Sequence, residues 1–154
     1  MKKAIITILI MAFFNLMCKP AVKMQHFKDN GNGTITDVIT GLMWESKPSI
    51  KKMNWYEAMD YAKNFRLAGY SDWRLPTEPE YHKLIEHSDR TNKAVWLNVN
   101  GFRNVLPHRY WSSTTLGGYQ DTAWYLDMSC GFILHDKKKI KNKTYAICVR
   151  SVNR

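Results

Sequence analysis

The stretch DNGNGTITDVITGLMW, residues 29–44, constrains the fold more than any other part of this 154-residue chain. Its two Asn-Gly pairs supply the positive φ angles that tight turns require, and the alternating run 34–37 predicts a short strand. Gly41 predicts a second turn, after which residues 42–44 enter the core. A calcium loop is the alternative, but neither of its two registers combines acidic or amide ligands at positions 1, 3 and 5 with glycine at position 6. The stretch therefore predicts a β-meander.

Two amphipathic helices are predicted after the meander. Asn54 and Glu57 form a capping box at the start of the first helix, and Gly69 ends it. Thr77 and Glu80 start the second helix in the same way. Apolar side chains at helical spacing give each helix one inward face, made by Trp55, Ala58, Met59 and Ala62 in the first and by Tyr81, Leu84 and Ile85 in the second.

The second half of the chain combines one irregular segment with strand-like runs. Residues 88–109 show no clear period and predict a long ordered loop, a kind of segment on which binding surfaces are often built. Four strand-like runs follow, with turns at Gly117-Gly118 and Cys130-Gly131. At this length the chain fits one domain, which we place at residues 26–154.

The first 17 residues are predicted to be an export signal and not part of that domain. Lys2 and Lys3 precede an uncharged run of 14 residues, which is short for a membrane span and typical of a secretory signal. Residues 18–25 then form a short linker. The chain is therefore expected in the cell envelope, as an outer-membrane lipoprotein or as a periplasmic or secreted protein.

Cys18 stands at the end of the apolar run, where bacterial lipoprotein signals are cut and acylated. Such signals usually have leucine three residues before the cysteine and a small residue directly before it, and this chain has Asn15 and Met17 there. Two interpretations remain open. Either Cys18 is acylated and anchors the domain to a membrane, or the signal is cleaved near Ala21 and Cys18 is lost.

The charge of the chain favours anionic partners. Removal of the signal takes Lys2 and Lys3 and no acid, so the net charge falls from +10 to +8. Such a charge attracts acidic polysaccharides and anionic lipid headgroups over long range. Nucleic acid is not an expected partner, because the chain is predicted to be exported.

Two cysteines remain in the domain, Cys130 and Cys148. In an oxidising compartment they are expected to form a disulfide, which would stabilise the fold by about 3 kcal/mol in the chain-entropy model. Two free buried thiols are the alternative.

Several motifs together resemble the Lcl C-terminal domain family. They are DNGNGTITDVITGLMW, AGYSDWRLPT, YWSST, AW and CVR, in that order, and the resemblance covers about residues 26–151. It implies an α+β, C-type-lectin-like fold, in which two helices pack on small twisted antiparallel sheets with long irregular loops. It also implies export and surface adhesion, without an agreed activity. The family often has a cysteine where this chain has Lys63, and the resemblance implies that it lies near the last-strand cysteine, which Cys148 matches. That partner is missing here, and we infer that Cys130 replaces it.

Activities known for similar folds do not carry over to this chain. Calcium-dependent lectins use a Glu-Pro-Asn-type tripeptide in the long loop, whereas Glu78-Pro79-Glu80 stands at a helix start. Formylglycine-generating enzymes use a close cysteine pair that this chain lacks. Asp72 and Arg74 are expected to pair locally and not to act as catalytic groups. We therefore predict no catalytic residue, no metal and no cofactor.

The aromatic and basic residues divide into core and candidate ligand-binding positions. Five tryptophans in the motifs are assigned to the core: Trp44, Trp55, Trp73, Trp111 and Trp124. Rings on the predicted loops, at Trp96 and Tyr119, can either contact a ligand or plug the loop to the core. Cations on these loops can contact a ligand as well, and the run HDKKKIKNK adds attraction for sulfated or carboxylated polymers. A solvated hairpin tip is the alternative for that run. The candidates are Trp96, Arg103, Arg109, Tyr119, Lys137, Lys138, Lys139, Lys141 and Lys143.

The sequence thus predicts an exported binding module for a glycan, in particular an acidic polysaccharide, or for a cell-surface protein. A structural or assembly protein of the envelope is one alternative, and an enzyme on the same scaffold is another. A broad exposed apolar patch would favour the envelope-assembly role.

Overall fold

The computed structural model describes residues 25–138 and 144–152. The predicted export signal, Cys18, most of the linker, and the candidates Lys139, Lys141 and Lys143 lie outside the described residues.

The predicted meander is confirmed. Strands β1 (Phe27–Asp29), β2 (Thr34–Asp37) and β3 (Leu42–Glu45) pair antiparallel in sequence order. Gly31 and Gly33 have φ angles of 74° and 87° in the first turn, and Gly41 has 68° in the second, so the glycines stand where left-handed backbone is needed. The Asn30 amide donates to the hydroxyls of Thr34 and Thr36, which fixes the first turn from within.

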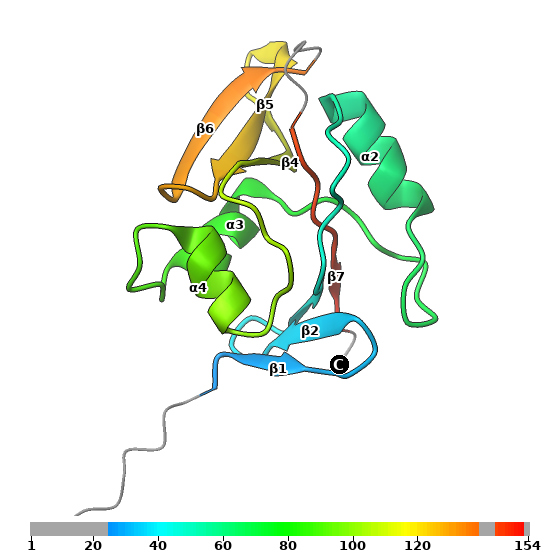
Figure 1. The fold of residues 1–154 in the computed structure, drawn as a ribbon. Coiled ribbons are helices and arrows are strands. Elements are labelled where there is room, and N and C mark those ends of the chain that lie inside the picture. The colour runs from blue at the N-terminus through cyan, green and yellow to red at the C-terminus, as the bar shows by residue number, and fades with distance from the viewer. Residues whose placement is uncertain (1–24, 139–143, 153–154) are drawn as a thin grey trace, which may run out of the picture.

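A second sheet lies at the opposite end of the molecule (Figure 1). It contains β4 (Arg109–Leu116), β5 (Tyr119–Asp127) and β6 (Phe132–Lys137), paired antiparallel as β4-β5-β6. The fourth predicted run gives only the short strand β7 (Val149–Ser151), and β7 joins the first sheet beside β3.

Three helices are present among the described residues, one more than predicted. Helix α2 (Trp55–Asn64) and helix α3 (Glu78–Ile85) begin with the predicted capping boxes. Helix α4 (Lys93–Val99) lies where a loop was predicted, and that prediction was wrong. Asn92 caps α4 by accepting a hydrogen bond from the backbone N–H of Val95. Two helical turns are too short to show a clear period in the sequence.

The core consists of two apolar clusters. Trp44, Tyr81 and Leu97 belong to the first, which lies between the first sheet, α3 and α4. Trp73 and Trp111 belong to the second, which α2 covers. The buried Tyr81 hydroxyl donates to the backbone carbonyl of Trp111 at 3.0 Å and so connects the two clusters.

The predicted core tryptophans are buried at three of five positions. Trp44, Trp73 and Trp111 are buried, whereas Trp55 and Trp124 are only half-buried. Trp55 lies at the start of α2 and donates from its indole N–H to the Ser112 carbonyl at 2.8 Å. Trp124 lies edge-on against the ring of His135. These two rings therefore bridge elements at the surface.

Asp72 and Arg74 were both expected to pair locally, and only Arg74 does so. Arg74 pairs locally with Glu80, at 2.7 Å between Nη2 and Oε1, as expected. Asp72 instead pairs with Arg150 of β7, at 2.8 Å between Oδ1 and Nε, so the local pairing predicted for Asp72 was wrong. This ion pair ties the extended segment before α3 to the first sheet. No helix in the described part of the chain has the length and apolar character to cross a membrane.

Candidate functional site

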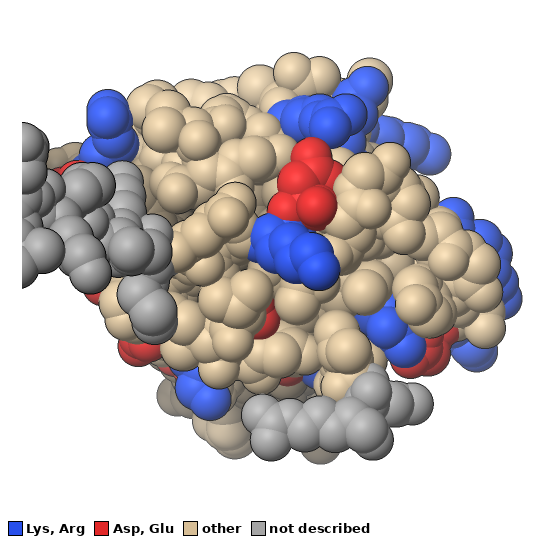
Figure 2. All heavy atoms as spheres, turned by 90° about the horizontal axis from the view of Figure 1, so that it is seen from below, with Lys and Arg blue, Asp and Glu red and all other residues tan. Residues whose placement is uncertain are grey.

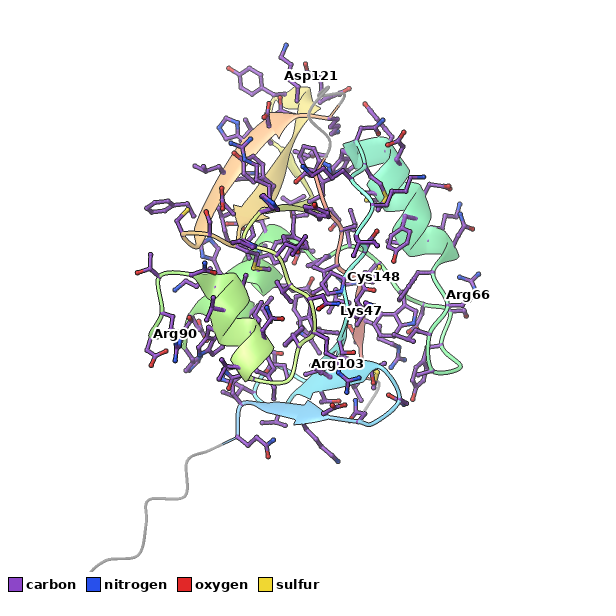
Figure 3. All side chains as sticks on the ribbon, viewed as in Figure 1. Lys47, Arg66, Arg90, Arg103, Asp121 and Cys148 are labelled. Carbon is purple, nitrogen blue, oxygen red and sulfur yellow. The ribbon has the colours of Figure 1, made fainter. Side chains whose placement is uncertain are left out.

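The structure does not gather the predicted ligand-binding residues into one site. Arg103 follows α4 and pairs with Asp29 at the end of β1, at 3.2 Å between Nη2 and Oδ2. Tyr119 and Lys137 lie at the far end of the second sheet, where Lys137 pairs with Asp121. Figure 3 shows Asp121 at the top of the molecule, far from Arg103 in its lower half.

Trp96 and Tyr119 differ in their access to solvent. Trp96 is only 7% exposed and packs edge-on against Phe27 and His26, so of the two possibilities for this ring the structure has the one in which it anchors its segment to the core. Tyr119 is 64% exposed at the β4–β5 turn and is accessible to a ligand.

Lys138 has a structural role in place of the predicted ligand-binding one. Its side chain is 6% exposed, its ammonium lies 4.3 Å from the centre of the Trp55 ring, and it donates to the Gln120 carbonyl. A lysine that is buried against a ring and hydrogen-bonded to the backbone fixes the end of β6 and is not available to a ligand.

The predicted disulfide was wrong, because Cys130 and Cys148 are both free thiols. Cys130 is half-buried in the β5–β6 turn, whereas Cys148 lies fully buried in the second core cluster, directly before β7. The Cys148 backbone N–H donates to Glu45 Oε1 at 2.6 Å. Burial is the main cause that raises the pKa of the Cys148 thiol, and the neighbouring Glu45 adds to it.

We expect iodoacetamide to modify Cys130 in the folded protein and Cys148 only after unfolding in urea. The thiolate is the reactive form, and a buried thiol with a raised pKa supplies little of it. Peptide mass mapping before and after denaturation measures both positions. A non-reduced peptide pair that contains both cysteines would contradict the free-thiol state.

The net positive charge lies mainly outside the described residues. All 13 Asp and Glu lie in the described part, together with 15 of the 23 Lys and Arg. Figure 2, a view onto the end that carries β1 and β2, shows separated basic side chains with acidic ones between them. A search for an anion site must therefore look for local clusters of cations.

One such cluster lines a cleft of about 410 Å³ where β4 begins and β5 ends, which we call the Arg109 cleft. Its lining comes from segments that are far apart in the sequence. The lining residues are Lys52, Pro107, His108, Arg109, Asp127, Ser129, Thr144 and Tyr145.

The Tyr145 ring forms one wall of the Arg109 cleft. The His108 ring stacks on it with 5.6 Å between ring centroids and 24° between planes. The Lys52 ammonium lies 5.5 Å from the centroid of the same ring. Two nitrogen-bearing side chains therefore approach one aromatic surface. Sequence reasoning missed all three of these residues.

Arg109 is held in place without using its hydrogen-bond donors. Its guanidinium lies 4.9 Å from the centroid of the Tyr125 ring, and its nitrogens are 3.9 Å from Asp127 and 3.8 Å from Asp136. Those distances exceed a hydrogen bond. Asp127 accepts instead from the backbone N–H and hydroxyl of Ser129. Within the described residues the guanidinium N–H groups of Arg109 make no hydrogen bond, so they can bind an acidic group.

Thr144, which lines the cleft, follows Lys143 directly in the chain. Thr144 Oγ1 donates to the Arg109 carbonyl, and Tyr145 N–H donates to the same carbonyl at 3.0 Å. In the described ranges, no three of His, Cys, Asp and Glu come together as metal ligands. The chemistry that this cleft offers is electrostatic and aromatic binding.

No curated protein matches the chain. A family model described as the Lcl C-terminal domain matches residues 33–150, which include every described helix and all strands except β1 and the last residue of β7. The match covers most of the chain, and the chain therefore belongs to the Lcl C-terminal domain family.

Proposed function

We propose that this chain is an exported binding module, anchored to a membrane through Cys18, whose Arg109 cleft binds acidic groups of a glycan. Lys52, His108 and Arg109 present cationic or protonatable nitrogens to one cleft that has an aromatic wall. Tyr145 is only 8% exposed, so the ring that can lie against the apolar face of a sugar is the exposed His108 ring stacked on it, while the cations bind the sulfate or carboxylate groups of the sugar.

The single observation that carries the proposal is the state of Arg109. Two carboxylates and the Tyr125 ring hold its guanidinium at the mouth of the cleft, yet its donors have no hydrogen-bond acceptor among the described residues. Guanidinium groups bind sulfates and carboxylates through paired hydrogen bonds. An arginine fixed in this way has little side-chain freedom left to lose when a ligand binds.

The lysine-rich connection supports the same proposal from the sequence. Lys139, Lys141 and Lys143 precede Thr144, which lines the cleft. We propose that these lysines add long-range attraction for a polyanion, whereas the cleft supplies the short-range contacts.

We expect the double substitution Lys52→Ala and Arg109→Ala to weaken binding to a sulfated or carboxylated polysaccharide by about tenfold or more, since each lost contact with a charged group costs about 1 kcal/mol or more. The measurement is the Kd of the purified mature protein for chondroitin sulfate and for polygalacturonate, with uncharged dextran as a negative ligand. Binding should weaken as the salt concentration rises from about 50 to about 200 mM, because salt screens the attraction between charges. It should persist in the presence of a calcium chelator.

Lys83→Ala is the matched control, because Lys83 is an exposed lysine on α3 away from the cleft, and it should leave the Kd unchanged. Thermal melts establish that the variants are folded. If only glutamine substitutions at Lys139, Lys141 and Lys143 reduced binding, the cleft would not be the site. If no acidic polymer bound at either salt concentration, a cell-surface protein or an envelope-assembly role would replace the glycan.

A further inference from the structure

A second cavity, of about 480 Å³, lies between the segment after β3, the end of α2 and Arg103, and we call it the Glu45 cavity. None of its lining residues belongs to the Arg109 cleft. The neighbouring residues Lys51 and Lys52 are divided between the two, since Lys51 lines the Glu45 cavity and Lys52 lines the Arg109 cleft. Its volume lies within the range of small-molecule sites, about 300–1,000 Å³. Figure 3 shows Lys47 and Arg103, which both line this cavity, near Cys148 in the middle of the molecule.

The walls of the Glu45 cavity are largely apolar. Tyr61 and Phe65, one helical turn apart at the end of α2, pack together with 5.4 Å between ring centroids. Leu67 extends this wall, and its side chain reaches the first turn at Gly33. Ile50 stands at the mouth and is 73% exposed, a high value for an isoleucine. The cavity can therefore bury an apolar group of a ligand.

Basic side chains surround this apolar wall. Lys47 and Lys51 are exposed on the segment after β3, and Arg103 lines the opposite side, where Asp29 pairs with it. The lining contains no carboxyl other than Glu45. An anion in the cavity would meet two lysines that have no ion-pair partner in the described chain.

Glu45 itself does not oppose an anion at neutral pH. Its side chain is 1% exposed, and burial raises the pKa of its carboxyl to about 8, so the protonated, uncharged form predominates at pH 7. Its Oε1 accepts a hydrogen bond from the Cys148 backbone N–H, which fixes the carboxyl at the edge of the cavity. Burial also raises the pKa of Tyr61, so its hydroxyl stays neutral as well.

From these contacts we infer that the Glu45 cavity binds a small organic anion with an apolar body, such as an aromatic or short-chain aliphatic carboxylate or sulfonate. Tyr61, Phe65 and Leu67 contact the apolar body, and Lys47 and Lys51 bind the anionic group. This site is independent of the glycan site proposed in the Arg109 cleft, because the Glu45 cavity and the Arg109 cleft share no lining residue.

The probe that tests this inference is 1-anilinonaphthalene-8-sulfonate, an apolar sulfonate that fluoresces when it leaves water. We expect the purified protein to bind it at one saturable site, from which octanoate displaces it and the neutral octanamide does not. Ile50→Asp, which places a negative charge at an exposed mouth position, should weaken the probe's Kd by about tenfold or more, and Lys47→Ala should weaken it by severalfold.

Val99→Asp is the matched control, since Val99 is 69% exposed on α4 and lines a different pocket. It should leave the Kd unchanged. Because this probe also binds partly unfolded chains, near-ultraviolet circular dichroism must show native packing in each variant. Equal affinity in Ile50→Asp and the parent protein, equal competition by octanamide, or no binding would each overturn the inference. None of these results depends on whether acidic polysaccharides bind the Arg109 cleft.

Discussion

Trp111→Ala is expected to remove about 3–5 kcal/mol of unfolding free energy, the usual cost of deleting a large buried aromatic side chain. Trp111 is fully buried in β4, its indole N–H donates to the Met53 carbonyl at 3.1 Å, and its ring contacts Tyr125 edge-on. A domain of this size has only about 5–15 kcal/mol in total. The variant should therefore lose a large fraction of its stability, and its unfolding midpoint in urea, followed by far-ultraviolet circular dichroism, should fall accordingly.

Trp124→Ala in the neighbouring strand is the matched control. Trp124 is half-buried and packs mainly against the His135 ring, so the cost should be less than half of that at Trp111. Equal losses at the two positions would show that the second core cluster does not centre on Trp111.

Glu45→Gln is expected to stabilise the protein at neutral pH, by on the order of 3 kcal/mol at pH 7, since each pKa unit is worth about 1.4 kcal/mol. In the folded protein the Glu45 carboxyl has a pKa of about 8, against an ordinary value of 4.5. At pH 7 the unfolded chain gains the free energy of ionising this carboxyl, and the folded chain does not. Glutamine keeps the volume and an acceptor for the Cys148 N–H, but it cannot ionise.

The sign of the pH dependence follows from the raised pKa. The contribution of Glu45 to stability is complete below pH 4.5 and is lost as pH rises towards about 8. Over this window, the gap between the variant and parent unfolding free energies should therefore widen with pH. Urea unfolding at several pH values measures that gap. Glu86→Gln, at an exposed carboxyl, should show no such widening. Parallel curves for Glu45→Gln and the parent would refute the neutral buried carboxyl.

Much of the fold could be predicted because short-range rules determine it. The two capping boxes need only a residue and its third neighbour, and both form as predicted. The meander needs only its glycines and alternating side chains, and its register follows. Helix α4 was missed because seven residues give too little periodicity to separate a helix from a polar loop.

The candidate sites were harder to predict because they depend on contacts between distant segments. Lys52, His108 and Tyr145 come together only when 144–149 packs between the segment before α2 and the start of β4. No spacing rule in the sequence brings these three residues together. The prediction of a disulfide was wrong for a similar reason, because the buried position of Cys148 beside Glu45 follows from the pairing of β7 with β3.

The place of β7 also determines the order in which this chain can fold. Leu42 pairs with Ser151 and Met43 with Arg150, so the first sheet, whose other strands lie near the start of the domain, is complete only when the last described strand is present. On the way to β7, the same segment pairs with β4 through Tyr110 and Tyr145. Contacts between residues so far apart in sequence slow folding, because a long loop must close before they form. A chain that enters its folding compartment with its N-terminus first therefore leaves the outer edge of β3 unpaired until the β7 segment arrives, and that interval is the one in which a chaperone would matter most.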